Sequence, residues 1–312
     1  MERWVPALGF LVLSAMVVVL LGFTVYEAWA LHSLGGFVVA AVLVGAVVEM
    51  VREGRRVPCA ALSELLQGAN LRAALALFLG ALLGYELSVH VGLGAVTAAS
   101  LVGLMAAAVV PAYAVPAYCG SFVGMTSARL LINHGELAIA ALVAALIYLL
   151  TLCAYPGLGG KLGTIAFTGS VITGWGLDRE FLITPVPAPP VILEIIAYAV
   201  VATVVTYWLN HDRGRGPVMA SALVSLVGGL VLPALDAVHG PTLAVMVMCA
   251  SFAGMSSRER FPRGGLMAVV GTVAGAIFIY SMPTLGGAGG KLGTIAFGSA
   301  LAVQGYAGLL RR

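Results

Sequence analysis

The sequence GGKLGTIAF occupies residues 159–167 and returns unchanged at residues 289–297, an offset of 130 positions. A second pair follows the same offset, because SFVGMTS at 121–127 corresponds to SFAGMSS at 251–257. Three single positions extend it: Pro111 with Pro241, Cys119 with Cys249, and Glu64 with Glu194. Self-similarity at a fixed offset indicates two copies of one structural unit.

The composition predicts that both copies lie in a membrane. Of the 312 residues, 61% are hydrophobic and 9% are charged, whereas about 25% of the residues in a soluble domain are charged. Residues 91–128 contain no charged residue and no histidine, although one helical crossing needs only about 20 apolar residues. We therefore expect an all-α polytopic membrane protein. No basic run is long enough to indicate a nucleic-acid partner.

Apolar runs predict about twelve transmembrane segments. They are 5–25, 34–51, 70–88, 91–108, 111–128, 137–155, 160–177, 191–209, 217–234, 241–257, 266–283 and 291–310. With a cytoplasmic amino terminus, every arginine except Arg129 and Arg179 falls on the inner side, as the positive-inside rule requires. We expect an integral protein of the plasma membrane with both termini in the cytoplasm.

The two copies are expected to have opposite topologies. An amino-terminal hairpin and linker (1–63) would precede a first unit (64–190) and a second unit (191–312), and each unit holds five segments. Because five is odd, the second unit enters the membrane from the other side. Transporters built from inverted repeats place the substrate near the bilayer midplane, where the repeats meet.

The repeated motif contains the only two lysines of the chain, Lys161 and Lys291, whereas the other strongly basic residues are arginines. An ammonium group is compact and offers three donors. The preceding glycines permit a break from which a helix with unpaired N–H groups can begin, and a threonine follows each lysine by three residues. We expect a donor-rich binding site where the two breaks meet. Its residues are Gly159, Gly160, Lys161, Thr164, Gly289, Gly290, Lys291 and Thr294, with Ser121, Thr126, Ser251 and Ser256 from the other repeated segment.

A structural interpretation of the same residues stays open. Lys161 could extend to the inner surface while the glycines let helices pack, although Lys291 lies toward the outer side in the expected topology, where this explanation does not fit. Three glutamates, Glu64, Glu194 and Glu86, are candidates for ion coupling. Acidic residues at helix starts are also favoured by the helix dipole alone.

Together these patterns predict a secondary carrier or facilitator for a small anionic or polar solute that works by alternating access. A cation or proton antiporter is less favoured, because segments 111–128, 160–177, 241–257 and 291–310 contain no carboxylate. An ion or solute channel stays open. An enzyme acting on a lipid-linked substrate is the remotest alternative, since no nucleophile with a base and no metal-ligand set stands out. We expect no catalytic residue, no metal and no cofactor; the partners would be the solute, the bilayer and, as an open alternative, a second copy.

Overall fold

The computed structural model describes residues 5–56 and 67–310, and within these ranges it contains twelve α-helices and no strand. The α-helices are α1 (Val5–Leu31), α2 (Ser33–Gly54), α4 (Gly68–Tyr85), α5 (Ala95–Val109), α6 (Ala114–Val123), α7 (His134–Leu150), α8 (Lys161–Gly176), α9 (Pro189–His211), α10 (Pro217–Leu235), α11 (Gly240–Gly254), α12 (Gly265–Ser281) and α13 (Lys291–Leu309). A π-helical turn, η1 (Glu86–His90), follows α4, and a 3-10 turn, η2 (Pro111–Tyr113), precedes α6. The expected all-helical class is confirmed for the described residues.

Six of the described helical segments are long and apolar enough to cross a membrane. They are α1, α2, α4 with η1, α9, α10 and α13. The other described helices are shorter, up to the 17 residues of α7 and α12. A helix of that length reaches about 26 Å, whereas the hydrocarbon core is about 30 Å thick. The expected number of twelve crossings therefore stays a prediction.

Helix α6 covers only part of the expected segment 111–128. It ends at Val123, and the next residue, Gly124, packs closely on α4, where an added Cβ would lie 2.5 Å from the carbonyl oxygen of Ala81. The Thr126 hydroxyl then donates to the Val123 carbonyl over 2.6 Å. The second half of SFVGMTS is thus a turn and not helix.

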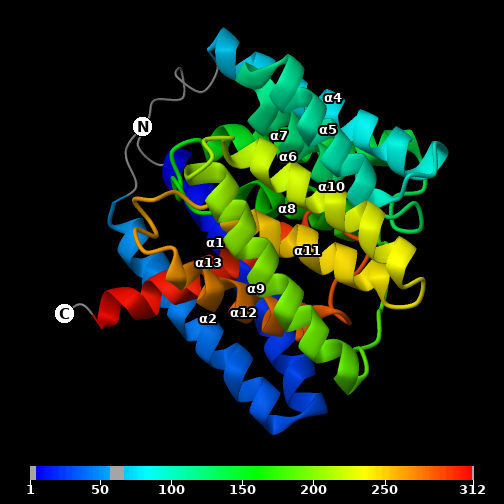
Figure 1. Ribbon diagram of the computed structural model, residues 1–312. Coiled ribbons are helices and arrows are strands. Elements are labelled where there is room, and N and C mark those ends of the chain that lie inside the picture. Colours follow the sequence, from blue (N-terminus) through cyan, green and yellow to red (C-terminus); the bar gives the residue numbers. More distant parts are fainter. Residues whose placement is uncertain (1–4, 57–66, 311–312) are drawn as a thin grey trace.

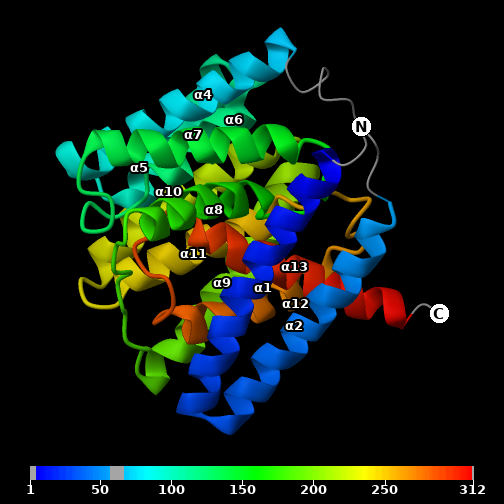
Figure 2. The same ribbon diagram turned by 180° about the vertical axis from the view of Figure 1, so that it is seen from behind.

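The α1–α2 hairpin packs against α12 and α13, and α1 also contacts α7 and α8. Helix α4 lies at the edge of the molecule opposite the turn of this hairpin (Figures 1 and 2). Helices α8 and α13 contact each other. An ion pair also ties the hairpin to the loop after α11, because the Arg260 guanidinium donates to both carboxylate oxygens of Glu53 at 2.8 Å.

The backbones of α8 and α13 are in direct contact. A Cβ added to Gly163 would lie 2.5 Å from the Cα of Gly293, and one added to Gly293 would lie 2.4 Å from the Cα of Gly163. Only glycine permits this approach, which is typical of close helix packing in membranes. These two glycines themselves stand 130 positions apart.

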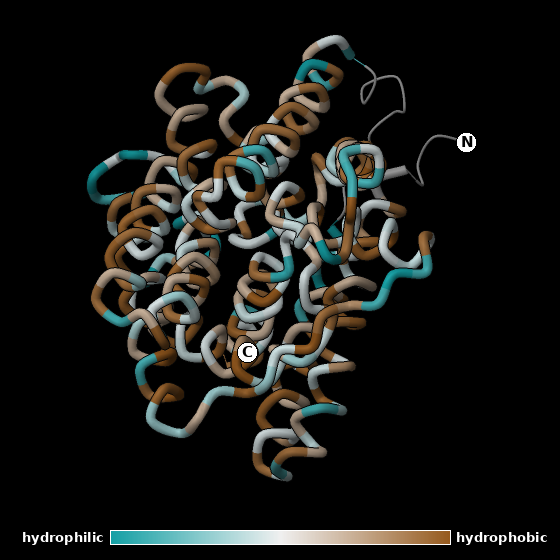
Figure 3. Tube along the Cα trace, turned by 90° about the vertical axis from the view of Figure 1, so that its right-hand side faces the viewer, coloured by the Kyte–Doolittle hydropathy of each residue, from teal (hydrophilic) through white to brown (hydrophobic). Residues whose placement is uncertain are grey.

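The exterior of the helices is apolar. Leu34, Val109 and Leu193 are each about three-quarters exposed. Figure 3 shows hydrophobic residues along most of the helical trace, with hydrophilic residues mainly in loops and near helix ends. An apolar exterior on helices that satisfy their own backbone hydrogen bonds fits a chain inserted in a membrane.

Candidate functional site

Each lysine is the first residue of a helix that follows a glycine in the left-handed conformation. Gly160 has φ +85° and precedes Lys161, and Gly290 has φ +84° and precedes Lys291. Most L residues avoid this conformation, so glycine is required at both positions. The helix starts that the motif predicts are therefore present at α8 and α13.

The ammonium group of each lysine caps the end of the preceding helix. Lys161 Nζ donates to the Thr151 carbonyl at 2.6 Å, and Lys291 Nζ donates to the Ser281 and Thr284 carbonyls, both at 2.5 Å. These oxygens lie at the ends of α7 and α12, where unpaired carbonyls and the helix dipole favour a cation. An ammonium group has three N–H donors. Among the described contacts, Lys161 uses one of them and Lys291 uses two.

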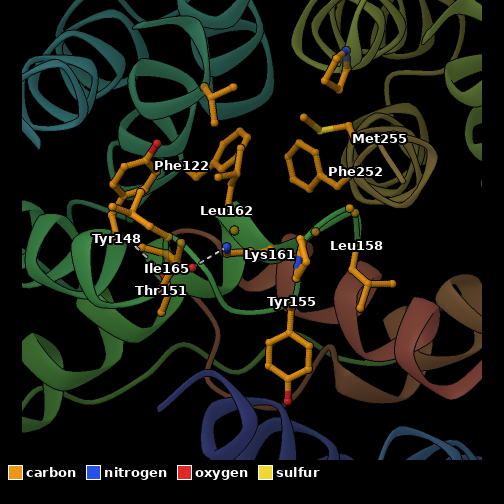
Figure 4. Close-up of a pocket in the computed structure, with 18 residues that line it drawn as sticks. Phe122, Tyr148, Thr151, Tyr155, Leu158, Lys161, Leu162, Ile165, Phe252 and Met255 are labelled. Carbon is orange, nitrogen blue, oxygen red and sulfur yellow. Dashed lines mark hydrogen bonds between the residues drawn. The ribbon is translucent and has the colours of Figure 1, made fainter. Parts of the chain in front are cut away.

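The lysines line two separate cavities. The Lys161 cavity has a volume of about 300 Å³ and the Lys291 cavity about 360 Å³. In Figure 4 the Lys161 side chain extends toward Thr151, with the rings of Phe122 and Phe252 on one side of it. Corresponding residues line both cavities: Val115 and Val245, Tyr148 and Phe278, Thr151 and Ser281, and Ile165 and Ile295. The structure thus differs from the expected single site, because each helix break forms a cavity of its own.

Among the described residues, no aspartate or glutamate lines either cavity, and the lysine is the one basic residue in each. Of the proposed coupling residues, Glu194 is exposed on α9, and Glu86 contacts two histidines away from both cavities. Glu64 lies outside the described residues. An apolar cavity with one unopposed cation attracts an anion or an electron-rich oxygen.

The glycine loops are held by hydroxyl groups from the other repeat. The amide of Gly159 donates to Ser256 Oγ at 3.0 Å, and the amide of Gly289 donates to Thr126 Oγ1 at 3.1 Å. Both hydroxyl groups are buried. The structure therefore brings these four predicted residues together in pairs. The two glycines line the cavities, whereas the two hydroxyl groups support the loops and line neither cavity.

The other predicted hydroxyls do not reach the lysines. Ser121 and Ser251 donate to carbonyls within α6 and α11, and Ser251 also contacts two serines of α10. Thr164 makes a long 3.4 Å bond to the Gly160 carbonyl. Thr294 is buried, and its hydroxyl has no hydrogen-bond partner among the described residues.

An aromatic pair at the Lys161 cavity was not predicted from the sequence. The ring centroids of Phe122 and Phe252 are 4.5 Å apart, and both residues line the Lys161 cavity but not the Lys291 cavity. These phenylalanines also stand 130 positions apart, in the two SF segments. Their corresponding positions in the repeated segment were the sequence signal from which this aromatic pair could have been predicted.

The fold and these two cavities define a helical protein with long apolar helices, consistent with membrane insertion, and with two related lysine sites. Comparison with protein-family models, curated proteins and solved structures found no match. The chemistry of the cavities is therefore the basis for a functional inference.

Proposed function

We propose that the protein is a secondary carrier or facilitator for a small anionic or polar solute, which binds alternately beside Lys161 and beside Lys291. The observation that carries this proposal is the pair of corresponding cavities, each with one of the two lysines and with no acid among the described residues that line it. A carboxylate or similar group of the solute would accept charge-assisted hydrogen bonds from the ammonium group.

The two cavities lie toward opposite ends of α10. Pro217 begins α10 and lines the Lys161 cavity, whereas Pro241, just beyond the turn that follows α10, lines the Lys291 cavity. The 19 residues of α10 span about 28 Å, close to the thickness of a hydrocarbon core. In this proposal the Lys161 cavity faces the cytoplasm and the Lys291 cavity faces outward. The chain would lie in the plasma membrane with both termini in the cytoplasm.

Inverted five-helix repeats are part of the proposal, and backbone details support them. Gly94 before α5 has φ 76° and ψ 156°, and Gly216 before α10 has φ 78° and ψ 159°, an offset of 122. Tyr85 and Tyr207 share that offset, and each donates to a carbonyl in the loop before α7 or α12.

The offset is therefore 122 for the first two helices of each unit and 130 from α6 onward. Helix α10, with 19 residues, is longer than the 15-residue α5, and the eight extra positions lie between Gly216 and α11. In this register Glu86 corresponds to Trp208.

Alternating access requires a solute that interacts differently with two states. In the described state the Lys161 ammonium group donates to one carbonyl, whereas that of Lys291 donates to two. Lys161 therefore has more donors left for a solute. The Phe122–Phe252 pair and the Gly163–Gly293 contact lie between the corresponding parts of the two units. Movement of one unit against the other would rearrange these contacts and exchange the roles of the lysines.

The test is charge movement in proteoliposomes on rapid exchange of a panel of small anions and cations, with labelled-anion counterflow to detect electroneutral exchange. We expect anion-dependent signals that fall at least about tenfold in Lys161→Met and in Lys291→Met, because each loses its charged donor. Arg258→Met is the matched control, since Arg258 is an exposed cation paired with Asp212.

Cation-dependent signals that survive in both lysine variants would overturn the proposal in favour of an antiporter. Steady anion conductance without counterflow would indicate a channel. If the wild type gives neither charge movement nor counterflow with any solute in the panel, the proposal that it transports these solutes is wrong.

A further inference from the structure

Three side chains of the types that can ligate metal ions lie close together where the α-helix α4 continues into the π-helical turn η1. Glu86 and His90 belong to η1, and His134 is the first residue of α7. Glu86 Oε1 lies 2.5 Å from His134 Nε2, and Glu86 Oε2 lies 3.0 Å from His90 Nδ1. One ligand atom from each residue lies within 4.8 Å of the other two.

The local backbone produces this arrangement. The Val91 amide donates to the Glu86 carbonyl at 2.9 Å, five residues earlier, which is the hydrogen bond of a π-turn. Such turns are rare and are frequent at functional sites. The widened turn presents Glu86 and His90 together toward the start of α7.

The two imidazole rings are also oriented. Their planes are stacked at 13° with centroids 5.1 Å apart, and the Tyr85 ring meets both of them edge-on. Asn133 caps α7 by accepting from an amide of its first turn, which fixes the backbone at His134. The ligand atoms therefore converge through both backbone and side-chain contacts.

We propose that Glu86, His90 and His134 form a site for one divalent transition-metal ion, with Zn²⁺ as the best match. Two imidazole nitrogens and one carboxylate oxygen are the protein ligands of open zinc sites, in which a water or another ligand takes the fourth position. Zinc–ligand bonds of about 2.0–2.2 Å place neighbouring ligand atoms about 3.4 Å apart, so small side-chain movements suffice. The nitrogen ligands disfavour Mg²⁺ and Ca²⁺, which prefer oxygen.

The surroundings leave room for the fourth ligand. The side chains of Glu86, His90 and His134 are 46%, 51% and 55% exposed. The Glu86 carboxylate pairs with both imidazoles, and a bound metal ion would replace these contacts. The site is independent of the lysine cavities, so its test can fail without affecting the transport proposal.

The chain offers a matched control in Asp236 and His239, whose carboxylate oxygen and Nδ1 are 3.0 Å apart. This exposed pair has one imidazole, not two. The amides of His239 and Val238 donate to Asp236 and hold the pKa of its carboxyl group below the ordinary value. It should not retain a metal ion.

The experiment titrates Zn²⁺ into the full-length, metal-free protein without a histidine tag, in competition with a chromophoric chelator. We expect one tightly bound Zn²⁺ per chain. His90→Ala and His134→Ala should each weaken binding at least about 100-fold, since loss of a mere supporting contact already costs 10–100-fold. His239→Ala should leave affinity unchanged.

A second measurement needs no variant. Zn²⁺ should protect His90 and His134, but not His239, from diethyl pyrocarbonate in the wild type, as read by mass spectrometry. The proposal is overturned if the wild type takes up no Zn²⁺, if the His90→Ala and His134→Ala variants bind it as well as the wild type does, or if protection is equal at all three histidines.

Discussion

Gly163 and Gly293 determine how closely the two central helices approach. Each would place an added Cβ within 2.5 Å of the other residue's Cα. Because that neighbour is backbone, no side-chain rotation can relieve the overlap. The glycine of the GKLG sequence is thus needed for the packing of these two helices.

We predict that Gly163→Ala and Gly293→Ala each lower the free energy of unfolding by about 2–3 kcal/mol, the upper range for overpacking. Gly22→Ala is the control, because no atom of residues 5–56 or 67–310 lies within 4 Å of a Cβ at that helical position. Denaturant titration in mixed micelles measures all three. Equal stability of Gly163→Ala and Gly22→Ala would contradict the backbone contact.

The loops before α8 and α13 are fastened to the turns after α11 and α6. Besides the two hydroxyl contacts, the Ser257 amide donates to the Gly157 carbonyl and the Ser127 amide to the Gly287 carbonyl, both at 2.8 Å. Each lysine-bearing helix therefore starts on a support from the other repeat. Displacement of α6 or α11 would move the opposite helix start.

We predict that Thr126→Ala and Ser256→Ala each lower the free energy of unfolding by about 1–3 kcal/mol, because each leaves a buried amide without its acceptor. The sequence itself supplies the controls: Thr126→Ser and Ser256→Thr exchange the residues of the two copies and keep the hydroxyl. Thermal unfolding in detergent compares the four variants. The support is disproved if the alanine variants are as stable as the exchanges.

In the interior of the described structure, corresponding segments of the two copies face each other, and the proposed inverted topology accounts for this arrangement. It requires the loop that contains Arg129 and the loop that contains Arg263 to lie on opposite sides of the membrane. Both side chains are exposed.

We predict that a membrane-impermeant maleimide added outside intact cells labels Arg129→Cys but not Arg263→Cys, in a background with the four native cysteines replaced. Arg258→Cys should behave like Arg263→Cys, because it lies in the same loop. Permeabilised cells should label all three. Equal labelling of positions 129 and 263 in intact cells would exclude the inverted arrangement.

The sequence was sufficient to locate most helices. An apolar run indicates the body of a helix, and a flanking glycine or proline indicates where the helix begins or ends. The expected segment 217–234, for example, differs from α10 by one residue. It failed at 111–128, where apolar residues continue through the turn at Gly124. Gly124 packs closely on α4 at that turn, and such a tertiary contact is not visible in a local sequence pattern.

The candidate site was predictable in part. The paired glycines and lysines indicated the helix starts, because left-handed backbone and charge leave a clear residue pattern. The backbone carbonyls that accept from the lysines leave no such residue pattern, since every residue has a backbone carbonyl. The histidine cluster was missed because Glu86 and His134 are 48 positions apart and meet only through the packing of α4 on α7.

The contact of Gly163 with Gly293 makes the two GGKLGTIAF copies each other's binding surface. In a contact with near-twofold symmetry, each position meets its own counterpart, as in an isologous dimer. Gly160 approaches the Gly293 carbonyl in the same way that Gly290 approaches the Gly163 carbonyl. The same sequence therefore fits both sides of this helix contact, and a substitution in only one copy disturbs the packing against the other. Because the two stretches pack against each other within one chain, there is a physical reason for residues 159–167 and 289–297 to keep identical sequences.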